Sequence, residues 1–255
     1  FFYRVRLNDV YLEDLQGDTL LYARSIIAGI RNINLLNKAI SIGSVDFNGA
    51  FVNLTIDSAR IANIKYFVEN IKSNNQKKGD WKVTFNNMRL NNSNLHLKNY
   101  HYRNREYGIN FTDLNISEIE ADIRRFAPSK DSLSFHISSL KFRESSGFIL
   151  DGLTADFSES KTFLKFQNLA ITTPSSSMTG NGVSLLFDRW SKFKRDSIFD
   201  GVKLMIDISN SSLSLDDLSY YASVFRNSDQ QITFTGQLKG PISNLQGRNL
   251  AVGFA

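Results

Sequence analysis

Residues 42–47 read IGSVDF, with apolar side chains at the first, fourth and sixth positions. The same pattern recurs at residues 85–90, 111–116, 137–142 and 166–171. In each copy the apolar residues alternate with a period of two once one extra residue is skipped, which is typical of a β-strand that contains a bulge. The first positions of successive copies lie 43, 26, 26 and 29 residues apart, or roughly one strand pair per copy. The sequence therefore predicts a repetitive array of strands.

Strand-like alternation also occurs outside or around these copies. It is clearest at residues 26–30, 50–56, 81–85, 133–137, 183–187 and 202–208. Polar or small residues occupy most of the intervening positions, so each strand has one apolar face and one polar face. We therefore expect a mainly β fold, an elongated and curled antiparallel sheet that forms an open trough, or β-groove, with one or two short helices. Because the pattern runs throughout, we expect a single elongated unit over residues 1–255.

Two segments depart from the strand pattern. Residues 61–71 have apolar side chains at intervals of three and four, which predicts a short amphipathic helix. The polar run at residues 72–80 follows it and reads as a flexible link. Residues 216–225 predict a second short helix, because Asp216 and Asp217 are placed to cap its start and to favour the positive end of its dipole.

The extra residue in each copy of the six-position pattern predicts where the sheet bends. In three copies it falls at Asn86-Asn87, Thr112-Asp113 and Ser138-Ser139. A bulge leaves one residue unpaired and increases the local twist of a strand. We therefore expect strand pairing to be disrupted at these three places.

Composition and charge narrow the function classes. Apolar residues make up 42% of the 255 residues and include 20 Phe, which is enough for a large β core. The net charge is +5, but Lys and Arg alternate with apolar residues or sit beside acids, so a solvated face is favoured over nucleic-acid binding. The chain has no Cys, so it can form no disulfide or thiolate metal site. No run of 18 apolar residues predicts a membrane-spanning helix.

No pattern in the sequence predicts catalysis. His96 and His136 alternate with apolar residues on predicted strands, and neither they nor His101 have a carboxylate at metal-ligand spacing. Phosphate-binding glycine runs and a nucleophile elbow are also absent from the sequence. We therefore expect a protein that is not an enzyme and that has no catalytic residues, no cofactor and no metal.

A sheet with one apolar face must cover that face. A second sheet, closure into a barrel or solenoid, and a trough with apolar contents are the three solutions. Periodicity alone favours an ordinary core. If the face is instead a trough for acyl chains, we expect its lining to include Val83, Phe85, Phe111, Phe135, Ile137, Phe166, Leu185, Leu204 and Ile206.

Several stretches carry a family resemblance. They are residues 10–14 (VYLED), 17–23 (GDTLLYA), 40–42 (ISI), 49–54 (GAFVNL), 146–150 (SGFIL), 211–218 (SSLSLDDL) and 240–247 (GPISNLQG). In this order they resemble the amino-proximal periplasmic part of the Bacteroidota translocation and assembly module TamB family, within the AsmA-like superfamily. The resemblance extends over essentially the whole chain, and none of the stretches is a catalytic signature.

The resemblance implies a much longer periplasmic protein, tethered to the inner membrane by an amino-terminal helix that this chain lacks. It implies a bridge-like role in lipid transfer and outer-membrane assembly, in which a β-trough guides phospholipid acyl chains between the two membranes. It also implies an outer-membrane partner of the TamA or BamA type and membrane contact through parts outside this chain. Two alternatives remain: a structural or adhesin-type β module without lipid, and a β-solenoid polysaccharide-active enzyme.

Overall fold

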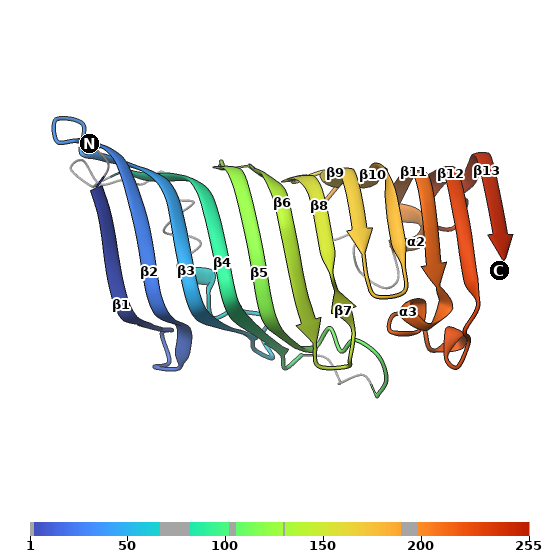
Figure 1. Cartoon of the computed structure of the whole chain (residues 1–255), viewed down its shortest axis with the longest axis horizontal. Coiled ribbons are helices and arrows are strands. Elements are labelled where there is room, and N and C mark those ends of the chain that lie inside the picture. Colours follow the sequence, from blue (N-terminus) through green and yellow to red (C-terminus); the bar gives the residue numbers. More distant parts are fainter. Residues whose placement is uncertain (1–2, 67–81, 102–105, 130, 190–197, 255) are drawn as a thin grey trace. The chain divides into compact units, whose positions relative to one another are not determined.

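A computed structural model describes residues 3–66, 82–101, 106–129, 131–189 and 198–254. The described residues form a sheet of thirteen strands, as drawn in Figure 1. The strands are β1 (Tyr3–Glu13), β2 (Thr19–Asn34), β3 (Ala39–Ile56), β4 (Lys82–Asn99), β5 (Asp113–Pro128), β6 (Ser132–Glu144), β7 (Ile149–Leu150), β8 (Gly152–Ser160), β9 (Phe163–Thr172), β10 (Ser177–Phe187), β11 (Val202–Ser214), β12 (Gln231–Pro241) and β13 (Gln246–Phe254). The prediction of a mainly β fold is confirmed.

Neighbouring strands in the sheet follow the order of the sequence, with the short β7 paired to β6 beside the main path. Nearly all the pairs of neighbouring strands are antiparallel, and most of these neighbours are joined by short turns. The exception is β3 with β4, which run parallel and are connected by the long segment that includes residues 57–66. The predicted open, mostly antiparallel sheet is therefore confirmed.

Contacts between Cα atoms divide the chain into two compact units. Unit 1 comprises Phe1–Phe126 and Lys141–Ile149, and unit 2 comprises Ala127–Leu140 and Leu150–Ala255. Buried apolar residues in unit 1 are Leu20, Ala23, Val45, Ala50, Ile109, Ile119, Ala121 and Phe148. Those in unit 2 are Ile137, Leu150, Ala155, Leu169, Phe187, Val202, Ile208 and Leu215. Each unit thus has its own set of buried side chains.

The sharpest backbone irregularities lie at residues with positive φ. Asp9, Gly49, Asn92, Glu118 and Asn168 have φ between 45° and 57°. Each follows an apolar residue by two positions and directly precedes the next residue on that side of the strand. A left-handed residue is the extra residue of a bulge, and it returns the following side chain to the original face. Of the five copies of the six-position pattern, only the copy at residues 166–171 has such a residue, Asn168, at its skipped place.

The predicted disruption is wrong at one of the three places. At Asn86-Asn87 it agrees with the structure: the aligned pairs of β4 with β3 omit Asn86 and Gly43, so both strands are irregular at the same level while the register on either side stays constant. Thr112 lies in the turn before β5, which begins only at Asp113. At Ser138-Ser139 the aligned pairs of β6 with β8 stop at Ile137, which agrees with the prediction.

The helices whose full extent lies within the described residues are short. The helix predicted over residues 216–225 is instead two pieces, α3 (Leu215–Ser219) and the 3₁₀ helix η2 (Ser223–Phe225). The cap of α3 is the Ser214 side chain, which accepts a hydrogen bond from the Asp216 backbone N–H, so the predicted aspartate cap is wrong. A further helix, α2 (Ile198–Gly201), directly precedes β11. The predicted helix at residues 61–71 lies outside the described residues beyond Tyr66, as does the whole predicted link at 72–80.

No helix within the described ranges is long and apolar enough to cross a membrane.

Candidate functional site: the apolar face of the sheet

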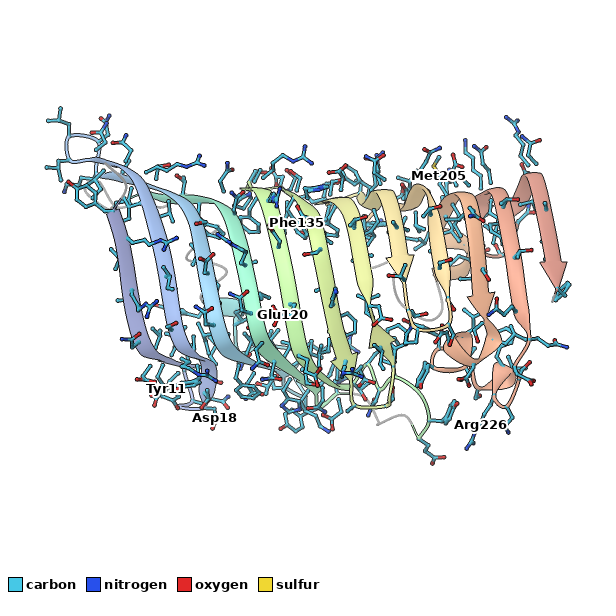
Figure 2. All side chains as sticks on the ribbon, in the orientation of Figure 1. Tyr11, Asp18, Glu120, Phe135, Met205 and Arg226 are labelled. Carbon is cyan, nitrogen blue, oxygen red and sulfur yellow. The ribbon has the colours of Figure 1, made fainter. Side chains whose placement is uncertain are left out.

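In unit 2 the strand register aligns one apolar row across six strands. Residues directly opposite each other on paired strands point to the same face of a sheet. The row consists of Phe135, Phe157, Phe166, Val183, Ile206 and Leu238, on β6, β8, β9, β10, β11 and β12 in turn. Phe135, labelled in Figure 2, begins the row on β6. We call these six residues the apolar row.

Aromatic contacts join the first three members of the apolar row. The rings of Phe135 and Phe157 are stacked with centroids 4.5 Å apart. Phe157 meets Phe166 edge to face, with centroids 5.1 Å apart. Such pairs contribute about 0.5–1.5 kcal/mol beyond the burial of their area. The contacts hold the three rings as a continuous apolar surface.

A second row runs beside the first, offset by two residues on each of three antiparallel strands. It contains Leu164, Leu185 and Leu204, which pair in register on β9, β10 and β11. With the apolar row they form a band several side chains wide, and every member of the band is half-buried.

The band is bounded by fully buried side chains on the same strands. Beyond Leu185 and Leu204 lie Phe187 and Val202, which are 6% and 0% exposed. On the other side lies Ile208, which is 2% exposed. The ends of this face therefore pack as a core, whereas its middle keeps part of its apolar surface in solvent.

The opposite face of the same strands is polar. His136 Nδ1 lies 2.9 Å from the Asp156 carboxylate, which also accepts a hydrogen bond from the Asn168 side chain at 2.7 Å. On β11, the Asp207 carboxylate accepts hydrogen bonds from Asn181 and Gln237, each at 2.9 Å. These contacts satisfy the polar groups in a half-exposed setting, so this face needs no covering layer.

Unit 1 repeats the arrangement. Its register aligns Leu7, Ile26, Phe47, Leu90 and Ala121 in one row, and Val5, Ala28, Val45, Met88 and Ile123 in the next. The Phe85 ring stacks on Phe126 with centroids 4.9 Å apart. Each unit thus presents one apolar face built by the same alternation.

The structure brings most of the predicted lining residues together within their own units. Phe135, Phe166 and Ile206 are in the apolar row of unit 2, with Leu185 and Leu204 beside them. Ile137 lies on the same face of β6 but is buried at 6% exposure, so it belongs to the core.

The three predicted residues in unit 1 are more dispersed. Phe85 lies in β4, where it pairs with Ile42. Val83 pairs with Ile40 through the backbone. Phe111 lies in the turn before β5 and is 55% exposed.

Sequence reasoning missed Phe157, Val183 and Leu238 as members of the apolar row. All three have polar or small residues on both sides, which is the signal that could have found them. The alternation identifies a face for each strand, but only the register shows which residues on different strands share a row.

Several titratable side chains form ion pairs on the sheet. In unit 1, the pKa of the Asp113 carboxyl is lowered by hydrogen bonds from the Lys98 ammonium and the His96 ring. His96 also lies 2.9 Å from the Asn53 side-chain oxygen. Within the described ranges, no group of three or more His, Cys, Asp or Glu side chains could hold a metal ion.

Comparison of the sequence with protein-family models and with curated proteins finds no match.

Proposed function

We propose that the band of unit 2, the apolar row with Leu164, Leu185 and Leu204, binds the acyl chains of a phospholipid. The observation that carries the proposal is one apolar row that crosses six strands with no charged member and stays half-buried. A core residue has its apolar surface fully packed, and these residues do not. Apolar surface left in solvent favours an apolar ligand.

The energetics suit a path for lipid better than a tight binding pocket. Burial of one methylene contributes about 0.8 kcal/mol, so exposing both tails of a phospholipid to water costs on the order of 20 kcal/mol or more. A uniform apolar band offsets much of this cost without hydrogen bonds that would select one lipid or hold it in place. Binding is therefore weak and unselective, as transfer along a surface requires.

On this proposal the chain is a periplasmic segment of a bridge-like lipid-transfer and outer-membrane assembly protein. The resemblance of residues 10–23 and 211–218 to the TamB family supports this wider role. The sheet would curl around the acyl chains as a trough, and head groups would remain in water. The inner-membrane tether and an outer-membrane barrel partner of the TamA or BamA type belong to the same proposal.

Lipid extraction from the purified chain tests the proposal most directly. The chain is expressed in the periplasm of a Gram-negative host, purified without detergent, and extracted for mass spectrometry. We expect co-purified phospholipid. A chain that carries none, and that takes none up from phospholipid vesicles, contradicts the proposal and leaves a structural or adhesin-type β module as the better reading.

Photo-crosslinking tests which face of the sheet contacts the lipid. Phe166 and Gln167 are adjacent on β9 and point to opposite faces, so each is replaced in turn by benzoylphenylalanine. We expect crosslinks to phospholipid from position 166 and few from position 167. Equal crosslinking at both positions would mean that lipid association is nonspecific.

A charge added to the band by substitution also tests whether the band binds lipid. Val183→Asp adds a carboxylate to the apolar row, and Ser184→Asp adds the same charge on the polar face one residue later. We expect Val183→Asp to remove most of the bound lipid and Ser184→Asp to retain it, because an unpaired charge beside an acyl chain costs several kcal/mol. Circular dichroism verifies that both variants fold.

A further inference from the structure

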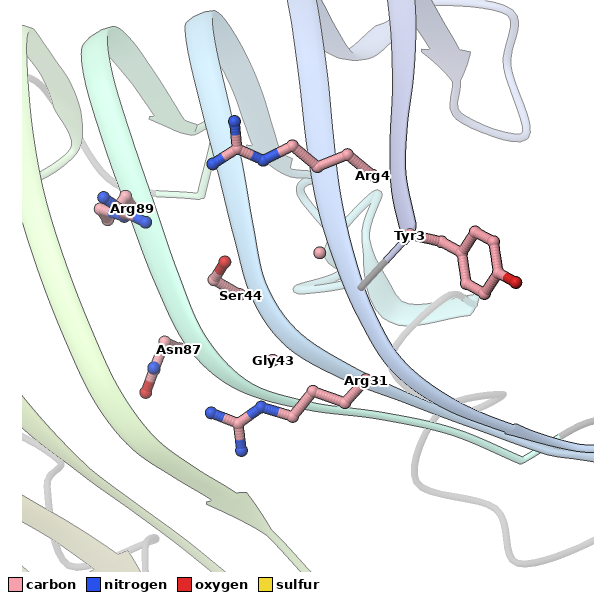
Figure 3. Close-up of a pocket in the computed structure, with 8 residues that line it drawn as sticks. Tyr3, Arg4, Arg31, Gly43, Ser44, Asn87 and Arg89 are labelled. Carbon is pink, nitrogen blue, oxygen red and sulfur yellow. The ribbon is translucent and has the colours of Figure 1, made fainter. Parts of the chain in front are cut away.

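A pocket of about 320 Å³ opens on the polar face of unit 1. Arginines from three different strands line it, namely Arg4 on β1, Arg31 on β2 and Arg89 on β4. Figure 3 shows the side chains of Arg4 and Arg31 extending past Ser44, one on either side of it, while the ring of Tyr3 points away. We call this the arginine pocket.

The strand register explains how the arginine pocket forms. Arg4 pairs with Gly29, Gly29 with Ser44, and Ser44 with Asn87, so these residues point to one face across four strands. That face is opposite the apolar row that contains Leu7 and Ile26. The pocket is therefore separate from the surface proposed to bind acyl chains.

A glycine lets Arg31 lie flat over the sheet. The register of β2 with β3 is irregular between Gly29 and Asn32, and both Gly43 and Arg31 are left without an aligned partner there. A Cβ atom on Gly43 would lie 2.6 Å from Nε of Arg31 and 3.1 Å from its Cγ. Any larger residue at position 43 would thus displace the Arg31 side chain.

The charges in the pocket do not balance. Nε of Arg89 lies 2.9 Å from the Asp46 carboxylate, which neutralises that guanidinium. Among the described residues, neither Arg4 nor Arg31 has an acidic side chain within ion-pair distance. The floor of small residues, Gly29, Gly43 and Ser44, adds no negative charge. Two guanidinium groups therefore face a polar hollow with uncompensated positive charge.

We propose that the arginine pocket binds a phosphate group, either a free phosphate or the phosphate of a larger molecule. The planar guanidinium presents paired N–H donors that match two oxygens of a phosphate, and charge-assisted hydrogen bonds of this kind are about twice as strong as neutral ones. On this proposal Arg31, which lies over Gly43, contacts the anion, and Arg4 adds positive charge on the other side of Ser44. The proposal does not depend on the binding of acyl chains to unit 2.

Titration of the whole chain with inorganic phosphate tests the site, monitored by calorimetry and by the amide NMR signals of Gly43 and Ser44. Arg31→Gln removes one guanidinium. Gly43→Ala keeps the net charge but displaces Arg31, and because it meets only the flexible Arg31 side chain the fold should remain intact. Arg248→Gln, on β13 of unit 2, is the control for a simple loss of charge.

We expect phosphate to shift the Gly43 and Ser44 signals, and Arg31→Gln and Gly43→Ala each to weaken binding about tenfold or more, as loss of a charge-assisted contact does. Arg248→Gln should bind as the unmodified chain does. Binding should also weaken as salt rises from about 10 to 150 mM, because the Debye length falls from about 30 to 8 Å. Equal binding by all four proteins would overturn the proposal.

Vesicles distinguish the sources of the phosphate. Binding to phosphatidylglycerol vesicles that depends on Arg31, without binding of free phosphate, identifies a lipid head group as the ligand. Binding of free phosphate with no preference for vesicles identifies a soluble ligand. If neither free phosphate nor the vesicles bind in an Arg31-dependent way, the arginine pocket is not a phosphate site.

Discussion

Ile206 and Ile208 are the same residue type on the same face of the same strand, yet their environments differ. Ile206 belongs to the apolar row and is half-buried, whereas Ile208 is 2% exposed. The row continues from Ile206 to Val183 and Leu238. A position in an alternating pattern therefore fixes the face of a residue but does not decide whether it is core or accessible surface.

The largest expected effect comes from a charge at each of these two positions. Ile208→Asp would bury an unpaired carboxylate at a cost of about 5 kcal/mol, which is comparable to the whole stability of many domains. We expect this variant to be unfolded by circular dichroism at 25 °C. Ile206→Asp should fold, because its carboxylate can reach solvent, and should lose bound lipid.

Two outcomes would contradict the difference in packing between Ile206 and Ile208. If both unfold, the apolar row is ordinary core and the proposed lipid surface fails. If both fold with equal stability, Ile208 is less tightly packed than its exposure indicates. Urea unfolding curves of the two variants decide between these outcomes.

Strands β9 and β10 approach each other closely at Gly182, beneath the band. Gly182 on β10 has a φ of 126°, and a Cβ at this position would lie 1.9 Å from the carbonyl oxygen of Phe166 on β9. Neither backbone can move without separating the two strands. We expect Gly182→Ala to lower the free energy of unfolding by about 3 kcal/mol, and to weaken lipid binding because Phe166 is displaced.

The matched control is Gly29→Ala in unit 1, where the added Cβ would lie 3.5 Å from the Ser44 hydroxyl in ordinary contact. Its effect on stability should be below about 1 kcal/mol. Similar losses in the two variants, measured by urea unfolding, would indicate that strand propensity and not the close approach of β9 and β10 is responsible.

The strands could be predicted from the sequence, but the details of their backbone could not. Period-two alternation predicted the strands and their apolar faces, and the spacing of 43 residues between the first two copies equals the offset that pairs Ile42 with Phe85. At Asp9 and Glu118 the skipped place in the alternation marks a local irregularity, but the residue type does not indicate a positive φ, since non-glycine residues seldom adopt one.

The candidate surface was predictable in its residue types but not in its extent. Phe157 and Leu238 join the apolar row only because of the register between strands, which depends on bulges along the sheet. Ile137, predicted to line the surface, is instead buried beside Ala155, which is 0% exposed. Which part of an apolar face is covered depends on neighbouring strands and loops, so alternation cannot report it.

The smallest expected effect is at Asp113, on the polar face of unit 1, where an ion pair and not burial contributes to stability. Hydrogen bonds from Lys98 and His96 lower the pKa of Asp113 below its ordinary value of 3.8. A lowered folded-state pKa means that the native state binds the proton less tightly than the unfolded state. The stabilisation is therefore fully present above the unfolded-state pKa and is lost as the pH falls through the folded-state pKa.

Asp113→Asn removes this dependence while it preserves the shape of the side chain. We expect the variant to lose about 1 kcal/mol or less at pH 6, because the pair is partly exposed and screened by solvent, and to match the unmodified chain once the pH has fallen below the lowered folded-state pKa of Asp113. Urea unfolding at both pH values measures the difference. If the loss of unfolding free energy persists at low pH, the Asp113 side chain contributes through packing and not through its charge.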